Sequence, residues 1–319
     1  MGTNGRTGTG TRMLGDLVVW YLFLGGAGAG LLLVVAILEC LSPQAVAADR
    51  AGRFEPPGSY RRFFGPAYLT GIAAIALGML CLLLDLGRGE RVLAVLFQPT
   101  LSFISVGAFA LLALIALAAV PAAVWAFGCA SLPKALMLVD RPLIAVVAVA
   151  VMAYTGLLLS SMPSVPLWAS PLLPVLFVVS SLSSGIALLT CAVVLTGSGE
   201  AFATTLERLR KIDAAVIVCE IVVLALFTAL AFLGGETARA SVERLVQGDL
   251  AAPFLGLVVA LGLLVPLICE VVGRKDALRA AVAASAFVLV GGFFLRWCIS
   301  EAGMAVDIAA SVTRVLGIQ

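Results

Sequence analysis

The stretch AYTGLLLSSMPSVPLWASPLLPVLF (residues 153–177) joins two long apolar segments through a short connector that carries no charge. The whole chain shares this character: of its 319 residues 62% are hydrophobic and only 12% are charged, and the mean hydropathy is +1.15. A soluble domain has roughly a quarter of charged residues. The protein therefore cannot cover its surface with hydrated side chains, and we expect the lipid bilayer to be its solvent.

Apolar runs of about 20 residues can cross a bilayer as helices, because a helix satisfies its own backbone polar groups. The sequence has eight such runs, so the expected fold class is an all-α integral membrane protein with eight transmembrane helices arranged as two four-helix bundles. The expected helices lie at about 15–41, 65–86, 102–127, 142–162, 172–196, 213–234, 251–272 and 278–299. We expect a flexible Gly/Thr-rich tail at 1–14, a first bundle at 15–163 and a second bundle at 171–319, with Trp168 of the connector at the membrane interface.

The distribution of basic residues predicts the orientation of the helices. The segments outside the helices on the same side as the two termini contain seven Lys and Arg residues, and those on the other side contain twelve. Arg296 falls inside the last helix. Basic residues are enriched in cytoplasmic segments. Both termini are therefore expected on the periplasmic, outer side of a bacterial cytoplasmic (inner) membrane.

The composition argues against several classes of protein. A net charge of only +2 gives no reason to expect a nucleic-acid partner. The sequence has no histidine, whereas a transmembrane b-type haem normally needs imidazole ligands. Its seven cysteines form no CxxC pair, which argues against iron–sulfur and zinc sites. We therefore expect no haem, no iron–sulfur cluster and no metal in this protein.

Among the charged residues within expected helices, where charge is costly and marks a functional site by default, three are considered together. Glu39, Glu220 and Arg296 belong to three different helices. One hypothesis is that they line a proton route from the cytoplasmic side. A structural network between helices is the alternative, and Arg296 could also extend its head group to the outer interface.

Polar groups from distant segments are expected to meet in the outer half of the first bundle. At 1.5 Å per residue, Tyr21 lies about 9 Å and Tyr154 about 12 Å below the same surface. Asp85 and Arg88 follow the second helix on that side, and Ser160 ends the fourth. Phenol donors within apolar walls suit a quinone, whose carbonyls need donors and whose ring needs a flat slot. Either tyrosine alone also fits an interfacial aromatic belt.

The glycine-rich stretch LGGAGAG (24–30) has two interpretations. The spacing of Gly26 and Gly30 is typical of close helix packing in membranes. Small side chains could also leave room for a flat ligand.

Four stretches give the sequence its resemblance to a known family. They are WYLFLGGAGAG (20–30), LLLDLGRGERV (82–92), YTGLLLSSMPSVPLWASPLLPVLFVVSSLSSG (154–185) and GGFFLRWCISEAG (291–303). In these stretches the protein resembles the NrfD/polysulfide reductase membrane-subunit (PsrC-like) family, over nearly its whole length.

The resemblance implies an eight-helix membrane subunit with no cofactor of its own and a quinone near the outer surface. Tyr21 and Tyr154 carry over to the quinone by position, and Asp85 and Arg88 match the acidic and basic element after the second helix. The sequence departs from the family pattern at three positions: Gly89 replaces a common proline, Met304 a common glutamine, and Tyr21 stands where some members have histidine.

The expected function is that of a quinone- or quinol-binding membrane anchor of a respiratory oxidoreductase. Such a subunit exchanges electrons between a menaquinone pool and a ferredoxin-like iron–sulfur subunit on the outer face. Beyond that partner, the resemblance implies a molybdopterin or multihaem cytochrome catalytic subunit. A secondary transporter and a purely structural anchor are the alternatives. Transporters, however, often have paired repeats, and none is clear in this sequence.

Overall fold

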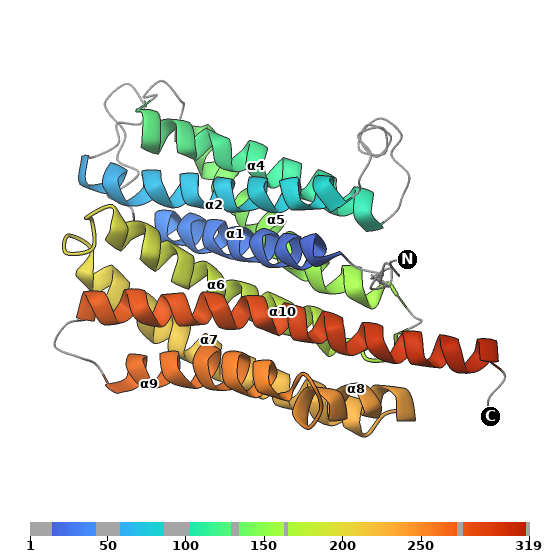
Figure 1. Cartoon of the computed structure of the whole chain (residues 1–319). Coiled ribbons are helices and arrows are strands. Elements are labelled where there is room, and N and C mark those ends of the chain that lie inside the picture. The colour runs from blue at the N-terminus through green and yellow to red at the C-terminus, as the bar shows by residue number, and fades with distance from the viewer. Residues whose placement is uncertain are drawn as a thin grey trace, which may run out of the picture.

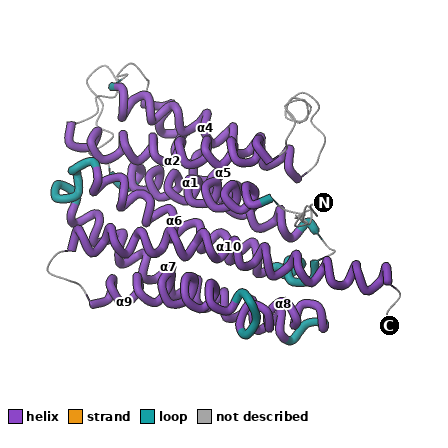
Figure 2. Tube along the Cα trace, viewed as in Figure 1, coloured by secondary structure: helices purple, strands orange, loops and turns teal. Residues whose placement is uncertain are grey.

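A computed structural model of the protein describes residues 15–42, 58–85, 103–128, 134–162, 165–272 and 277–316. Within these ranges all regular secondary structure is helical (Figure 2). The expected tail at 1–14 lies outside the described residues. The helices are α1 (Asp16–Cys40), α2 (Gly58–Asp85), α4 (Phe103–Phe127), α5 (Lys134–Ser160), α6 (Leu172–Leu195), α7 (Ala203–Phe232), α8 (Glu236–Val246), η2 (Ala252–Leu264), α9 (Val265–Val272) and α10 (Ala277–Leu316).

Eight helical segments in the described part of the protein are long and apolar enough to cross a membrane, which confirms the predicted number. They are Leu17–Cys40, Gly58–Asp85, Ser105–Phe127, Leu136–Ser160, Leu172–Leu195, Ala203–Phe232, Ala252–Cys269 and Ala280–Met304. The seventh combines the whole of η2, which is wound as a π-helix, with the start of α9.

Several helices begin earlier than the apolar runs predicted. α5 begins at Lys134 instead of 142, with Pro142 inside it, and α7 begins at Ala203 instead of 213. The predictions were wrong here because proline and charged residues were taken as helix boundaries. Asp140, Arg141 and Asp213 are buried side chains within helices as a result.

The short helix α8 was not predicted, because its polar sequence has no apolar run. Arg244 near its end donates to both carboxylate oxygens of Asp249, each at 2.6 Å, and to the backbone oxygen of Glu301 in α10 at 3.2 Å. The guanidinium also holds the pKa of Asp249 below its usual value. Arg244 therefore attaches this extramembrane segment to α10.

The helices lie side by side along a common direction (Figure 1). α1 packs against α2, α5 and α6, and α6 packs in turn against α7 and α10. α1 begins and α10 ends at the same end of the assembly, which we call the N-side end. The other end, where α1 ends and α2 begins, is the opposite end. The division at 163–171 into two four-helix bundles stays a prediction, as does the orientation in the membrane.

Trp168 is buried inside the protein, and its position at the level of the membrane interface stays a prediction. Its side chain is 1% exposed, and its indole N–H donates to the backbone oxygen of Ile299 at 3.0 Å. The indole ring occupies the space that a Cβ on Gly303 would need. The connector between α5 and α6 is thereby anchored to α10.

The glycine-rich stretch of α1 is a close helix contact, as its spacing suggested. A Cβ on Gly30 would collide with the backbone of Ser181 in α6, and a Cβ on Gly185 would lie 2.8 Å from the Cα of Gly30. The backbones of α1 and α6 therefore touch directly. Dispersion contacts of this kind hold membrane helices together where lipid removes the hydrophobic driving force.

We predict that Gly185→Val separates α1 from α6 and lowers the free energy of unfolding by about 1–3 kcal/mol or more, the usual cost of overpacking. Thermal unfolding in detergent measures the effect. Gly256→Val in η2 is the matched control, because a Cβ there meets no atom within 4 Å. Equal loss of stability in both variants would contradict the prediction.

Candidate functional site

The side chains of Tyr21 in α1 and Tyr154 in α5 lie close together inside the protein, in the half nearer the N-side end. Tyr21 is 1% and Tyr154 is 7% exposed. Their phenol groups are close enough to interact electrostatically. Both hydroxyl oxygens are buried and lie within reach of each other, and neither has a further hydrogen-bond partner among the described residues. The expected convergence of two phenols from distant segments is therefore present.

The phenol of Tyr154 lies directly on Gly107 of α4. A Cβ at position 107 would overlap the hydroxyl end of the ring. Tyr21 lies beside α2, since a Cβ on Gly78 would come 3.5 Å from the backbone oxygen of Tyr21. The two phenols therefore lie where α1, α4 and α5 meet, and α2 packs against the backbone of α1 at the level of Tyr21. If one hydroxyl donates to the other, the second O–H still lacks an acceptor. A buried hydroxyl without an acceptor costs about 1–3 kcal/mol, so this arrangement favours a further hydrogen-bonding group at the site.

The other residues expected at the mouth differ in their surroundings. Asp85 is exposed at the end of α2, with its carboxylate against Gly15 at the start of α1. Ser160 donates to the backbone oxygen of Gly156 in its own helix at 3.1 Å. Arg88 lies outside the described residues. Tyr21 is six residues from Gly15, so Asp85 lies about 9 Å above the phenols along the helix axis.

Arg296 of α10 is fully buried at mid-depth and does not extend to the interface. It donates to Ser181 at 2.7 Å, to Ser180 at 3.4 Å and to the backbone oxygen of Gly292 at 2.8 Å. Its guanidinium lies 5.6 Å from the ring centre of Phe23. A cation over an aromatic face is stabilised by the ring quadrupole. Arg296 therefore connects α10 to α6 and α1.

Glu220 of α7 belongs to the same cluster as Arg296. It is 4% exposed, lies within reach of Ser180 and interacts electrostatically with Arg296. Asp213, two turns earlier on the same face of α7, accepts a hydrogen bond from Ser183 at 2.8 Å. Polar groups thus continue along the α6–α7 interface from Asp213 to Arg296, over about 10 Å along α7.

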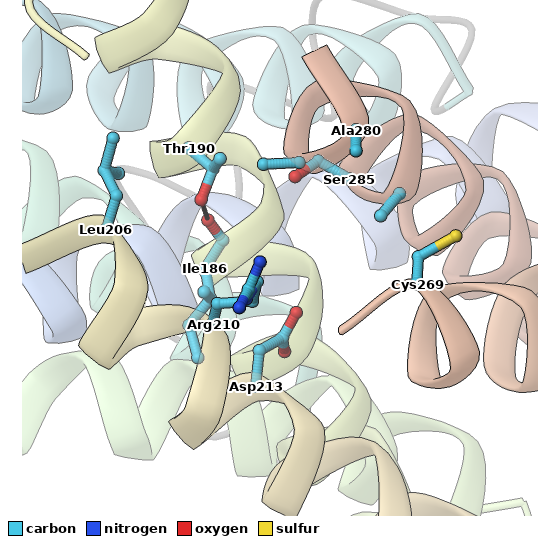
Figure 3. Close-up of a pocket in the computed structure, with 10 residues that line it drawn as sticks. Ile186, Thr190, Leu206, Arg210, Asp213, Cys269, Ala280 and Ser285 are labelled. Carbon is cyan, nitrogen blue, oxygen red and sulfur yellow. Dashed lines mark hydrogen bonds between the residues drawn. The ribbon is translucent and has the colours of Figure 1, made fainter. Parts of the chain in front are cut away.

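Asp213 also borders a small cavity of about 30 Å³ near the opposite end of the protein. Arg210 and Asp213 lie side by side in its wall (Figure 3). The cavity lies between α6, α7, α9 and α10, and Thr190, Ser285 and Cys269 add polar atoms to its lining. This cavity, which has charged side chains in its wall and room for solvent, therefore lies where the series of polar groups along α7 begins.

Glu39 forms a separate cluster near the opposite end. Its carboxylate is 0% exposed and accepts hydrogen bonds from Tyr68 at 2.6 Å, Trp125 at 2.9 Å and Arg141 at 2.6 Å. These donors come from α2, α4 and α5. The Glu39–Arg141 pair is a buried salt bridge with side chains 0% and 3% exposed. Glu39 of α1 is therefore connected by hydrogen bonds to α2, α4 and α5.

The structure brings some predicted residues together and separates others. Tyr21 and Tyr154 are neighbours, and so are Glu220 and Arg296. Glu39 is apart from both pairs: Arg296 meets α1 at Gly26, thirteen residues and about 20 Å from Glu39.

Sequence reasoning missed the partners of the buried charges. Arg141 was placed in a connector and Asp213 at the first position of an expected helix, because both border the apolar runs. A usable signal existed for Asp213, because Asp213 and Glu220 are seven residues apart and fall on one helix face. The indole of Trp125 and the phenol of Tyr68 had no such signal, since aromatic residues are common in any membrane helix.

Arg141→Met leaves the Glu39 carboxylate buried without its counter-ion, and we expect it to destabilise the protein by about 3–5 kcal/mol. Arg239→Met is the matched control, because its ion pair with Glu243 is exposed and should contribute at most about 0.5 kcal/mol. Combining Arg141→Met with Glu39→Gln should restore part of the loss. An unfolding transition unchanged by Arg141→Met would refute the role of this ion pair.

Comparison with known proteins gives consistent matches. The family described as "Polysulphide reductase, NrfD" matches residues 10–309. "Protein NrfD" of Escherichia coli (strain K12) is 32% identical over 308 residues, which cover 89% of this protein and 92% of that one. The C subunit of the polysulfide reductase of Wolinella succinogenes is 35% identical over 162 residues, 50% of this protein and 51% of that one. A third relative, "Protein NrfD homolog" of Haemophilus influenzae, is 32% identical over 156 residues, 47% of this protein and 48% of that one.

The family match covers nearly the whole sequence and agrees with the eight membrane-crossing helical segments. The protein is a multi-pass membrane protein that belongs to the NrfD/polysulphide reductase family.

Proposed function

We propose that the protein is the quinone- or quinol-binding membrane anchor of a respiratory oxidoreductase complex, with its quinone site at Tyr21 and Tyr154. The observation that carries the proposal is the pair of buried phenols that lie within reach of each other and have no further hydrogen-bond partner among the described residues, which leaves at least one O–H donor unused. A quinone presents two carbonyl oxygens that accept hydrogen bonds from such donors. Its ring is apolar and flat, as a site between packed helices requires.

Each phenol would orient the ring by donating to a carbonyl oxygen. Gly107 supports this role because it leaves room for the Tyr154 ring, which would hold the hydroxyl in place. Asp85, exposed near the N-side end of α1, would exchange protons between the site and the outer solution. Arg88 and Ser160 are proposed to shape the mouth of the site.

Oxidation of a quinol releases two electrons and two protons, so the electrons need an acceptor. We propose a ferredoxin-like iron–sulfur subunit docked at the N-side end, with a molybdopterin or multihaem cytochrome subunit beyond it. The names of the relatives support an assembly of this kind, since one is a subunit of polysulfide reductase. The proposed location is the bacterial cytoplasmic membrane, and the proposed pool is menaquinone.

We further propose that Glu220 and Arg296 belong to a proton route. The series of polar groups from the Asp213 cavity through Ser183 and Ser180 to Arg296 supports this. Arg296 adjoins Gly26 of α1, which lies five residues from Tyr21. Glu39 is outside this series, and its place in a proton route stays a prediction.

Tyr154→Phe should lower quinol-linked turnover by about 10-fold or more, because a hydrogen bond realised in the reacting complex contributes on the order of 1.4 kcal/mol or more. Turnover is measured with a soluble menaquinol analogue in the assembled complex. Tyr60→Phe at the opposite end of α2 is the matched control and should leave turnover unchanged.

Gly107→Ala provides a second variant, since the added methyl occupies the place of the Tyr154 hydroxyl. We expect weaker binding of a quinone analogue, measured by titration of the purified complex. Unaltered turnover and analogue binding in both variants, with the complex intact, would refute the proposed quinone site.

Glu220→Gln should reduce the number of protons moved per quinol oxidised in sealed vesicles, because the amide cannot carry a proton along the route. Glu207→Gln changes an exposed carboxylate of the same helix and should have no effect. A stoichiometry equal to that of the unmodified protein in Glu220→Gln would reject the route while leaving the quinone site standing.

A further inference from the structure

A groove at the opposite end of the protein lies between the first three turns of α2 and the last turn of α4. Its volume is about 440 Å³, and it is open to the outside. The described residues that line it are Gly58, Arg61, Arg62, Gly65, Pro66, Leu69, Trp125 and Ala126. Of these described residues two are basic and none is acidic. The groove is far from Tyr21 and Tyr154, since it lies where α2 begins and α4 ends.

Arg61 is fixed in the wall of this groove by the end of α4. It donates to the backbone oxygens of Trp125 at 3.3 Å and Ala126 at 3.4 Å. Gly128 ends α4 with a positive φ of 74° and leaves space for the guanidinium, because a Cβ there would lie 2.9 Å from it. Glycine in this conformation is a common helix end. The arginine is therefore held in one place by backbone oxygens, which leave its positive charge in the groove.

Arg62 provides the second charge. Its side chain is exposed, whereas its backbone oxygen accepts a hydrogen bond from Ser198 at 3.0 Å. Its backbone is thus attached to the segment between α6 and α7. Two guanidinium groups on a fixed backbone offer several N–H donors for a phosphate, which guanidinium binds with matched geometry.

The groove changes from basic to apolar along α2. Leu69 is 42% exposed and lies eight residues after Arg61, about 12 Å along the helix. Gly65 keeps α2 close to α4, since a Cβ there would be 3.2 Å from the backbone oxygen of Trp125. A molecule with an anionic head and an apolar tail matches this polarity and length. Basic pockets between helices at the membrane surface bind lipid head groups.

We propose that this groove is a binding site for an anionic phospholipid, with the phosphate between Arg61 and Arg62 and an acyl tail along Leu69. The positive-inside prediction places the groove in the cytoplasmic leaflet. Binding of the lipid would join the ends of α2 and α4 and is independent of the proposed quinone site.

The test measures lipid retention by the full-length protein. The protein is equilibrated in membranes of equimolar phosphatidylcholine and phosphatidylglycerol, extracted in mild detergent and weighed by native mass spectrometry. Arg62→Gln removes a charge without disturbing the Arg61 contacts. Gly58→Leu fills the groove without changing charge, because a Cβ at Gly58 meets no atom within 4 Å. Arg208→Gln is the matched control, an exposed arginine at the same end of the protein.

We expect the unmodified protein to retain phosphatidylglycerol in preference to phosphatidylcholine. Retention should fall about five-fold in Arg62→Gln, in line with the usual contribution of one basic residue near an anionic membrane. Gly58→Leu should also lose lipid, and Arg208→Gln should not. Inorganic phosphate added at high concentration should not displace the lipid.

Three results would overturn the proposal. Equal losses in Arg62→Gln and Arg208→Gln would show unspecific attraction to surface charge. Displacement by inorganic phosphate would show a site for a free anion rather than a lipid. Release of a protein subunit instead of a lipid in Arg62→Gln would show that the groove is a protein interface.

Discussion

The direct contact between α1 and α6 at Gly30 and Gly185 determines where the polar groups of this protein lie. Because the two backbones touch, Ser181 of α6 comes against Gly26 of α1, and Arg296 of α10 reaches both helices there. Without this contact the guanidinium would face a gap between helices. In lipid such a gap would expose a charge that has no solvent. Close packing of small residues is therefore a condition for burying the charge.

The two buried clusters stabilise a charge inside the protein in different ways. Glu39 has an arginine, a phenol and an indole as donors, so its negative charge is fully compensated by groups from three other helices. Arg296 relies on two serine hydroxyls, a backbone oxygen and aromatic rings, with Glu220 close by. Because most partners of Arg296 are neutral, the arrangement of side chains in the second cluster is less tightly fixed than that around Glu39. This difference supports a dynamic role for Glu220 and Arg296 and a structural role for Glu39.

The sequence predicts the fold well because the bilayer imposes a simple length rule. Eight apolar runs gave eight helices, and the fixed rise of a helix placed Tyr21 and Tyr154 at similar depth. Helix ends were predicted less well, because charged residues such as Arg141 and Asp213 continue a helix when tertiary partners exist. The periodicity of apolar residues does not predict which residues of different helices contact each other. Burial of Trp168 against Gly303 of α10, for example, depends on a residue more than 130 positions away in the sequence.

The phenol pair and the Glu39 cluster together suggest why the candidate redox site and the basic groove lie at opposite ends. Tyr21 and Glu39 are separated by eighteen residues of one helix, about 27 Å, which is close to the thickness of the hydrocarbon core. The buried cluster at Glu39 connects α1, α2, α4 and α5 near the opposite end. The polar groups that begin at Asp213, which borders a cavity, lie instead along α6 and α7. A proton route of the proposed kind therefore follows α6 and α7 rather than the Glu39 cluster.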